Sequence, residues 1–137
     1  MIDKLIKIGF RKVGKWVQNS TQIEYTLNDC GDDINILYCF VSENKILYLG
    51  KTVQPLKKRM CGYQNQGPTQ STNIKGNRNI RVLLSRDKPV EIYALPDNGL
   101  LHFGDFHINL AAGLEDSIVK TLNPLWNETG TANKSIN

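Results

Sequence analysis

The chain of 137 residues lacks any run approaching the roughly 18 to 20 consecutive apolar residues that a membrane-spanning helix requires. Its first residues carry the charges of Asp3, Lys4 and Lys7, where a secretory signal would need an apolar run. The three cysteines are odd in number and have no C-x-x-C spacing, which argues against a disulfide framework or a zinc site. Internal repeats and linkers are also absent. We therefore expect one soluble, cytoplasmic domain.

Carboxylates are missing between Asn44 and Arg86, a stretch that holds nine basic residues. The net charge of the whole chain is only +4, so this uneven distribution says more than the total. A stretch of one sign favours a polyanionic partner, because neutralising phosphates releases condensed counterions. A merely solvated basic face is the alternative.

The N-terminal region predicts a helix followed by a strand. Between residues 3 and 18 the apolar side chains recur with a roughly helical period, with lysines on the other face, which predicts an amphipathic basic helix. Such a helix covers one side of a core or, alternatively, binds a membrane surface. Residues 21–27 alternate and favour a strand.

Two apolar runs, residues 36–41 and 46–49, flank the turn residues 42–44 and predict a β-hairpin. Pairing that is symmetric about Glu43 would place Tyr38 directly opposite Tyr48. A helix is expected from about Pro55 to residue 64, in which Arg59 and Tyr63 are four apart and share a face. Residues 67–79 are polar and predict a loop, followed by a short helix and then a strand at residues 90–95.

The last predicted helix begins near Asn109, a competent N-cap, and ends at about Leu122 before Asn123 and a proline. Glu115 falls within its apolar stripe. Because a buried unpaired carboxylate is costly, we expect a metal ion or an arginine beside it.

Residues 35–127 resemble the GIY-YIG nuclease family. The first triplet of the family corresponds to residues 36–38 and the second to residues 48–50, with isoleucine in place of the first glycine and leucine in place of the second isoleucine. Neither departure changes a catalytic group. The matching functional positions are Tyr38, Tyr48, Arg59, Tyr63, Glu115 and Asn127.

The resemblance implies an α/β (α+β) fold: a small central, mostly antiparallel three-stranded sheet flanked by helices, with an extra N-terminal helix and strand. The domain boundaries would be residues 1–34 for this extension, 35–127 for the nuclease core and 128–137 for a polar tail. It implies a Mg²⁺-dependent DNA endonuclease, with Mn²⁺ as an alternative cation. Restriction-like cleavage of duplex DNA by a homodimer is the reading we favour. A structure-specific or single-strand nuclease of phage or repair type, and a catalytically silent nucleic-acid-binding module, stay open.

In this reading Glu115 holds the metal ion and Tyr38 acts as general base, its pKa lowered by Lys51, Arg59 and Tyr48. Arg59 contacts the scissile phosphate because its fixed fork suits nonbridging oxygens. Tyr48, Tyr63 and Asn127 orient water, phosphate and metal, with packing as the alternative role. The expected DNA-binding residues are Lys51, Lys58, Asn73, Lys75, Arg78 and Arg81.

Overall fold

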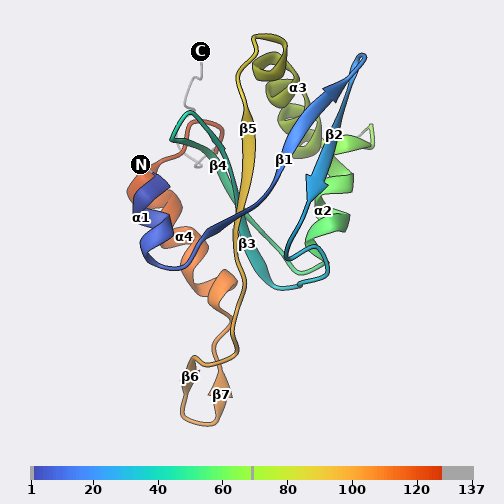
Figure 1. Ribbon diagram of the computed structural model, residues 1–137. Helices are drawn as coiled ribbons and strands as arrows, with labels where there is room; N and C mark the ends of the chain where they lie inside the picture. Colours follow the sequence, from blue (N-terminus) through green and yellow to red (C-terminus); the bar gives the residue numbers. More distant parts are fainter. Residues whose placement is uncertain (1, 69, 128–137) are drawn as a thin grey trace.

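The computed structural model describes residues 2–68 and 70–127. Its centre is a five-stranded antiparallel sheet with the order β2-β1-β5-β3-β4, and helices cover both of its faces (Figure 1). The mixed α/β class is confirmed, but the sheet is larger than the three strands expected. The strands are β1 (Arg11–Asn19), β2 (Gln22–Leu27), β3 (Ile36–Ser42), β4 (Lys45–Thr52) and β5 (Val90–Leu95).

The predicted basic helix over residues 3–18 is wrong. Helix α1 (Ile2–Lys7) ends within two turns, because Gly9 takes a positive φ of 115° that reverses the chain. The following residues form β1, which pairs with β2 on one side and β5 on the other. Burial of Val13 and Trp16 within this strand outweighs the approximate helical period. The N-terminal region therefore contributes the two additional strands of the central sheet, and the predicted strand at residues 21–27 is confirmed as β2.

The β3–β4 hairpin is confirmed, but its register differs from the one expected. Glu43 and Asn44 both have positive φ, forming a two-residue turn, and the register shifts between Phe40 and Val41, where Leu47 of β4 is the extra residue of a bulge. Tyr48 consequently pairs with Phe40, while Tyr38 pairs with Gly50. Tyr38 and Tyr48 still lie on the same face, as diagonal neighbours.

Helices α2 (Leu56–Gln64) and α3 (Ser71–Ser85) cover this face, on the right in Figure 1. The helix predicted from Pro55 is confirmed. The loop predicted over residues 67–79 is mostly wrong, because α3 begins at Ser71. Polar composition misled the prediction: Asn73 and Asn77 are buried, and tertiary hydrogen bonds satisfy their amides.

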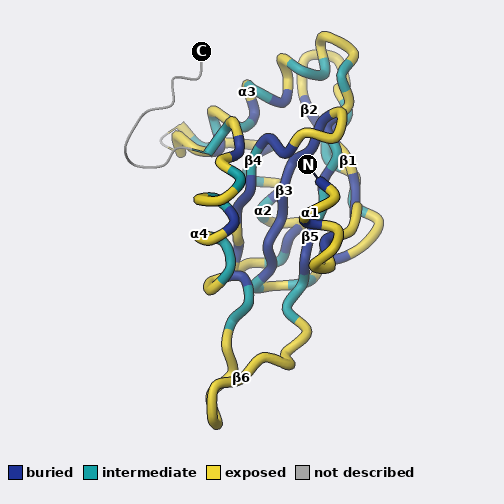
Figure 2. The backbone as a smooth tube through the Cα atoms, turned by 90° about the vertical axis from the view of Figure 1, so that its left-hand side faces the viewer, coloured by how far each residue is buried: buried dark blue, intermediate teal, exposed yellow. Residues whose placement is uncertain are grey.

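Helices α1 and α4 (Leu110–Leu122) cover the opposite face. As predicted, the side chain of Asn109 caps α4 by accepting a hydrogen bond from the amide of Ala112, and Asn123 ends it in the left-handed conformation. The two faces of the sheet thus bury separate cores. One core contains Trp16, Tyr38 and Tyr63, and the other contains Leu37, Cys39, Leu49, Ala111 and Ile118. The buried strands form the dark centre of Figure 2. The predicted tail, 128–137, lies outside the described residues.

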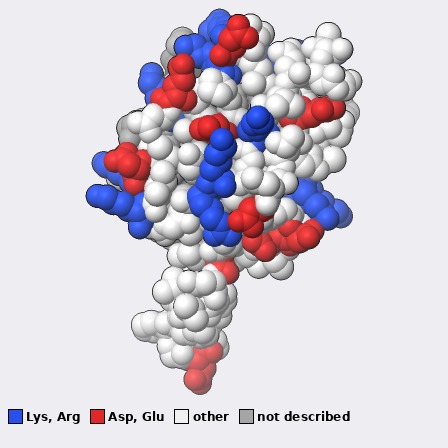
Figure 3. Space-filling view, in the orientation of Figure 1, with Lys and Arg blue, Asp and Glu red and all other residues white. Residues whose placement is uncertain are grey.

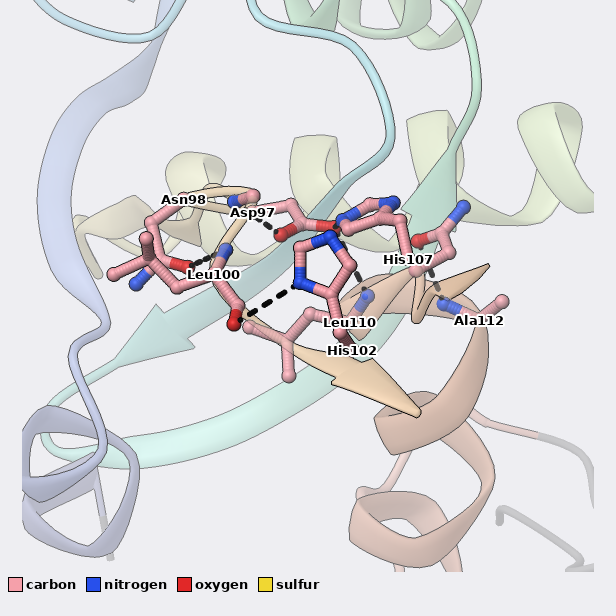
Figure 4. A network of polar contacts seen from close by, with 9 residues as sticks. Asp97, Asn98, Leu100, His102, His107, Leu110 and Ala112 are labelled. Carbon is pink, nitrogen blue, oxygen red and sulfur yellow. Dashed lines mark hydrogen bonds and ion pairs between the residues drawn. The ribbon is translucent and has the colours of Figure 1, made fainter. Parts of the chain in front are cut away.

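A small hairpin projects from the body between β5 and α4, with strands β6 (His102–Phe103) and β7 (Phe106–His107). We call residues 97–108 the finger. Both histidines, His102 and His107, lie there and are exposed. At its base the Asp97 carboxylate accepts hydrogen bonds from the amides of Gly99 and Leu110 and lies 3.1 Å from His107 Nε2 (Figure 4). These contacts tie the finger to the start of α4. No helix within the described ranges is long and apolar enough to traverse a bilayer.

Candidate active site

Three tyrosines from two strands and a helix meet on the α2–α3 face of the sheet. The ring centroids of Tyr38 and Tyr48 are 6.2 Å apart, those of Tyr38 and Tyr63 are 6.3 Å apart, and those of Tyr48 and Tyr63 are 6.5 Å apart. Strand alternation brings Tyr38 and Tyr48 to this face, and α2 lays Tyr63 over them. Only Tyr48 is partly exposed, because Tyr38 and Tyr63 are each 1% exposed.

A hydrogen-bonded chain fixes the cluster. The hydroxyls of Tyr38 and Tyr63 are 2.8 Å apart, and Arg59 Nη2 donates to the Tyr63 hydroxyl at 3.0 Å. Arg59 Nη1 donates to Asn73 Oδ1 at 2.6 Å, and the guanidinium carbon lies 4.2 Å from the centre of the Tyr63 ring. The four-residue spacing of Arg59 and Tyr63 thus produces contact, and α3 supplies a brace that sequence reasoning assigned to DNA binding instead.

Burial determines the protonation of the two inner phenols. It raises the pKa of Tyr38 far above the ordinary value of 10, and nearby Tyr48 raises it further, whereas Arg59 and the hydrogen bond with Tyr63 lower it. Burial also raises the pKa of Tyr63. Both phenols therefore carry their protons at neutral pH. The expectation that Lys51 helps to acidify Tyr38 is not met, since Lys51 pairs with Leu37 and points to the other face.

Two glycines allow this close packing. A methyl group at Gly50 would lie 2.8 Å from the Tyr38 hydroxyl and 2.8 Å from Cε2 of Tyr48, so only a bare backbone fits. A methyl group at Gly76 on α3 would lie 2.7 Å from the Tyr63 ring. Gly50 belongs to the motif quoted above, whereas sequence reasoning missed Gly76. The available signal was the position of Gly76 in the sequence, three residues after Asn73 and one before Asn77, the two buried asparagines of α3.

The segment after α4 returns to the exposed edge of β4. The Trp126 amide donates to the carbonyl of Leu47, and Asn127 exchanges two side-chain hydrogen bonds with Leu49, through its Oδ1 at 2.9 Å and its Nδ2 at 2.8 Å. These bonds cover the edge of the sheet beside Tyr48. Asn127 thus lies close to the tyrosine cluster, and its amide group contacts the β4 backbone; its predicted role in orienting the metal stays a prediction.

Glu115 lies on the opposite face of the sheet. Its Oε1 is 3.6 Å from Lys51 Nζ, so its protein partner is a lysine and not the arginine expected as one of the two possibilities. The Glu115 side chain is 27% exposed, less buried than its apolar stripe suggested. Since Lys51 directly follows Gly50, the carboxylate and the tyrosines approach β4 from its two sides.

The donor set around Glu115 fits a hydrated Mg²⁺ better than a fully caged ion. No group of three or more His, Cys, Asp or Glu side chains suited to a metal occurs in residues 2–68 and 70–127. Mg²⁺ commonly takes one or two carboxylates and keeps several waters. A partly exposed carboxylate with a single long ion pair offers oxygen atoms for such a cation.

The residues predicted to bind DNA are dispersed over three elements. Lys58 is exposed on α2, and Lys75 and Arg78 are exposed on α3. Arg81 on α3 donates from Nε to Asn77 Oδ1 at 3.0 Å. Asn73 is buried behind Arg59, and Lys51 pairs with Glu115, so in this structure both are engaged by the protein. The view in Figure 3 shows basic and acidic side chains interspersed over the body of the molecule.

No known family matches the chain by its sequence profile, and no curated protein sequence matches it. Solved structures do. A mutant of bacteriophage T4 EndoII, a GIY-YIG family endonuclease, superimposes with a TM-score of 0.73 and 22% identity, over 93% of this chain and 98% of that chain. The restriction endonuclease HPY188I, solved with product DNA, gives a TM-score of 0.55 and 20% identity, over 96% of this chain and 85% of that chain.

At these identities the likeness defines the fold. The chain has the fold of GIY-YIG-like nucleases, over nearly its whole length, and the resemblance drawn from its motifs is confirmed at that level. EndoII and HPY188I are both endonucleases.

Proposed function

We propose that this protein is a Mg²⁺-dependent endonuclease that hydrolyses phosphodiester bonds in DNA. The observation that carries the proposal is the buried chain of hydrogen bonds from Tyr38 through Tyr63 to Arg59. A purely structural core has little use for a half-buried guanidinium held against the Tyr63 phenol and the Asn73 amide, because burying a charge costs free energy. The shared fold of two endonucleases supports the same conclusion.

The proposed catalytic roles fall on the two sides of β4: phosphate and water contacts on the side of the tyrosines, and cation binding on the side of Glu115. Arg59, held by Asn73 and Tyr63, is rigid and always charged, so it suits the nonbridging oxygens of the scissile phosphate. Tyr48, the accessible phenol, orients the phosphate or the attacking water. Tyr38 is the proposed general base. Because burial raises its pKa, it can take this role only when the bound substrate and cation lower the pKa, and Arg59 already acts in that direction.

Glu115 would hold the cation, and Lys51 would be displaced from it or turn toward the DNA. Bound Mg²⁺ would supply charge stabilisation for the departing oxygen. Mn²⁺ accepts the same oxygen ligands, so we expect it to replace Mg²⁺. Asn127 would brace the edge of β4 beside this position.

The test is cleavage of supercoiled plasmid DNA with Mg²⁺, comparing the unmodified protein with Glu115→Ala. The matched control is Asp116→Ala, because Asp116 is the next residue of α4, is exposed and forms an ion pair with Lys120 on the same helix. We expect Glu115→Ala and removal of the metal by EDTA to abolish cleavage, and Asp116→Ala to retain it. Equal cleavage by the two variants would refute the proposed role of Glu115. Absence of cleavage by the unmodified protein with both Mg²⁺ and Mn²⁺ would refute the nuclease function and favour a silent DNA-binding module.

We further propose restriction-like cutting of duplex DNA in the cytoplasm. The cysteines of the described ranges, Cys30, Cys39 and Cys61, are all unpaired, which suits a reducing compartment. A site-specific enzyme converts plasmid DNA to discrete bands. A smear, or preferential cutting of branched or single-stranded DNA, would instead identify the structure-specific alternative.

The proposed homodimer would form through the finger. Phe103 is 80% exposed, Phe106 is 77% exposed and Leu100 is 75% exposed, and large exposed apolar patches mark protein contacts. The finger carries no lysine or arginine, and Asp105 lies at its turn, so phosphate is an unsuitable partner (Figure 3). A second copy of the finger is apolar in the same way and is self-complementary about a two-fold axis. Sedimentation should show a dimer for the unmodified protein and a monomer for Phe103→Ser/Phe106→Ser. A monomer in both cases would refute this interface.

A further inference from the structure

A cavity of about 390 Å³ adjoins the tyrosine cluster. It lies between α3 and the segment that follows α4, within the size range of pockets that hold small molecules, roughly 300 to 1,000 Å³. Its walls include three of the proposed active-site residues, Tyr48, Tyr63 and Asn127. The cavity is therefore continuous with the proposed site, yet it has no part in the chemistry described above.

The lining of the cavity combines three kinds of groups. The aromatic rings of Phe40, Tyr48, Tyr63 and Trp126 form its apolar part. Ser71, Thr72 and Asn79 offer uncharged donors and acceptors from one side of α3, and Lys75 and Arg78 add two cations. Among residues 2–68 and 70–127, none of those that line the cavity is a carboxylate. This combination suits a flat, hydrogen-bonding ring attached to an anionic group.

We propose that this cavity binds one unstacked nucleobase of the DNA, with its phosphate held by Lys75 and Arg78. This inference rests on the proposed function and specifies the substrate at the same site. Half-buried Trp126 and Tyr48 would supply the stacking surfaces, because every base has a π-face and stacks on aromatic side chains. The hydrogen-bonding groups of α3 would meet the edge of the base.

A paired base cannot fill this cavity. Inside a duplex the faces of each base are covered by its neighbours, so a base must leave the stack before a protein ring can contact its face. Unstacking costs least for a base that is mismatched or unpaired. The protein should consequently bind DNA with one unpaired nucleotide more tightly than the same duplex fully paired.

The test compares two fluorescent duplexes that are identical except for one extra unpaired thymidine in the middle of one strand. Binding is measured by anisotropy in EDTA, which prevents cleavage. Stacking on one aromatic ring corresponds to a factor between about 5 and 150 in affinity, and we expect about a tenfold preference for the bulged duplex. Trp126→Ala should remove the preference, and Trp126→Tyr should keep most of it.

Two further variants separate stacking from folding. Thr72→Trp places a large side chain into the cavity from an exposed position of α3, so it should remove the preference without lowering the melting temperature. Val53→Ala shortens an exposed apolar side chain that does not line the cavity and should leave the preference intact. The proposal is overturned if the unmodified protein binds both duplexes equally, or if the preference survives Thr72→Trp.

The plasmid assay keeps this inference distinct from the proposed function. Mg²⁺-dependent cleavage that requires Glu115, without preference for the bulge, would refute the base pocket and leave the nuclease intact. A preference that depends on Trp126, without any cleavage, would support the pocket and refute the nuclease. Equal displacement of the bulged duplex by inorganic phosphate and by thymidine monophosphate would show that only phosphate is recognised, and would overturn the base pocket.

Discussion

Substituting alanine for Gly50 tests whether the tyrosine cluster is as closely packed as the structure shows. The added methyl group would lie 2.8 Å from the Tyr38 hydroxyl and 2.8 Å from the Tyr48 ring. These distances are roughly 0.6 Å inside an ordinary contact of 3.4 Å. Tyr38 cannot move away freely, since its ring is buried against Phe40 and its hydroxyl is held by Tyr63. Most of the adjustment falls on Tyr48.

Overpacking of this kind costs about 1 to 3 kcal/mol. For a chain of this length, each kcal/mol lowers the melting temperature by about 3 or 4 °C, so Gly50→Ala should melt about 3 to 12 °C below the unmodified protein. Cleavage should fall more steeply. A displacement of catalytic groups by about 1 Å can cost on the order of 100-fold in rate, even where the protein remains folded.

The measurements are calorimetric melting and the rate of plasmid nicking at 25 °C. The control is Gly113→Ala on α4, where the nearest heavy atom to an added methyl group is 4.0 Å away. This change should be neutral or stabilise by about 0.5 to 1 kcal/mol, because alanine favours a helix over glycine. If Gly50→Ala melts and cuts like the unmodified protein, the two rings do not pack around Gly50 as described.

Three other predictions follow from the hydrogen bonds and pKa shifts. Tyr63→Phe removes the hydroxyl that links Tyr38 to Arg59. Urea denaturation should show a free energy of unfolding lower by about 1 to 3 kcal/mol, and cleavage should be lost. Unchanged stability would contradict the linkage. Because burial raises the pKa of Tyr38 and Tyr63, their stabilisation is complete below pH 10 and is lost as the pH rises, so ultraviolet titration should show two phenols that ionise only on alkaline unfolding. Hydrogen bonds, first that of the Gly99 amide, lower the pKa of Asp97 below 3.8, so its stabilisation is present above that pH and is lost as the pH falls. Asp97→Asn should therefore melt lower at pH 7 and show less acid dependence than the unmodified protein, and identical pH profiles would contradict this.

The sequence alone determined the elements with strong local signals. The hairpin at residues 36–49, the helix with Arg59 and Tyr63, and the capped helix with Glu115 are all present near their expected bounds. In each of these elements, the spacing of apolar residues and the turn, capping or proline residues at the ends predict the same structure. Local preference and tertiary packing therefore favour the same conformation. The residues of the tyrosine cluster could also be predicted from the sequence, because their order along the chain matches the motif of a known family.

Only the tertiary structure decided how these elements combine. Residues 11–19 form a central strand because β2 and β5 pair with them on the two sides. The approximately helical spacing of their apolar residues gives no information about these partners. The polar segment from Ser71 became a helix because Arg59 and the Tyr63 carbonyl satisfied its buried amides. The bulge after Phe40 shifted the register, and the alternation of β4 placed Glu115 and Tyr38 on opposite faces of one edge strand. Such outcomes depend on contacts between residues far apart in the chain, which no local pattern records.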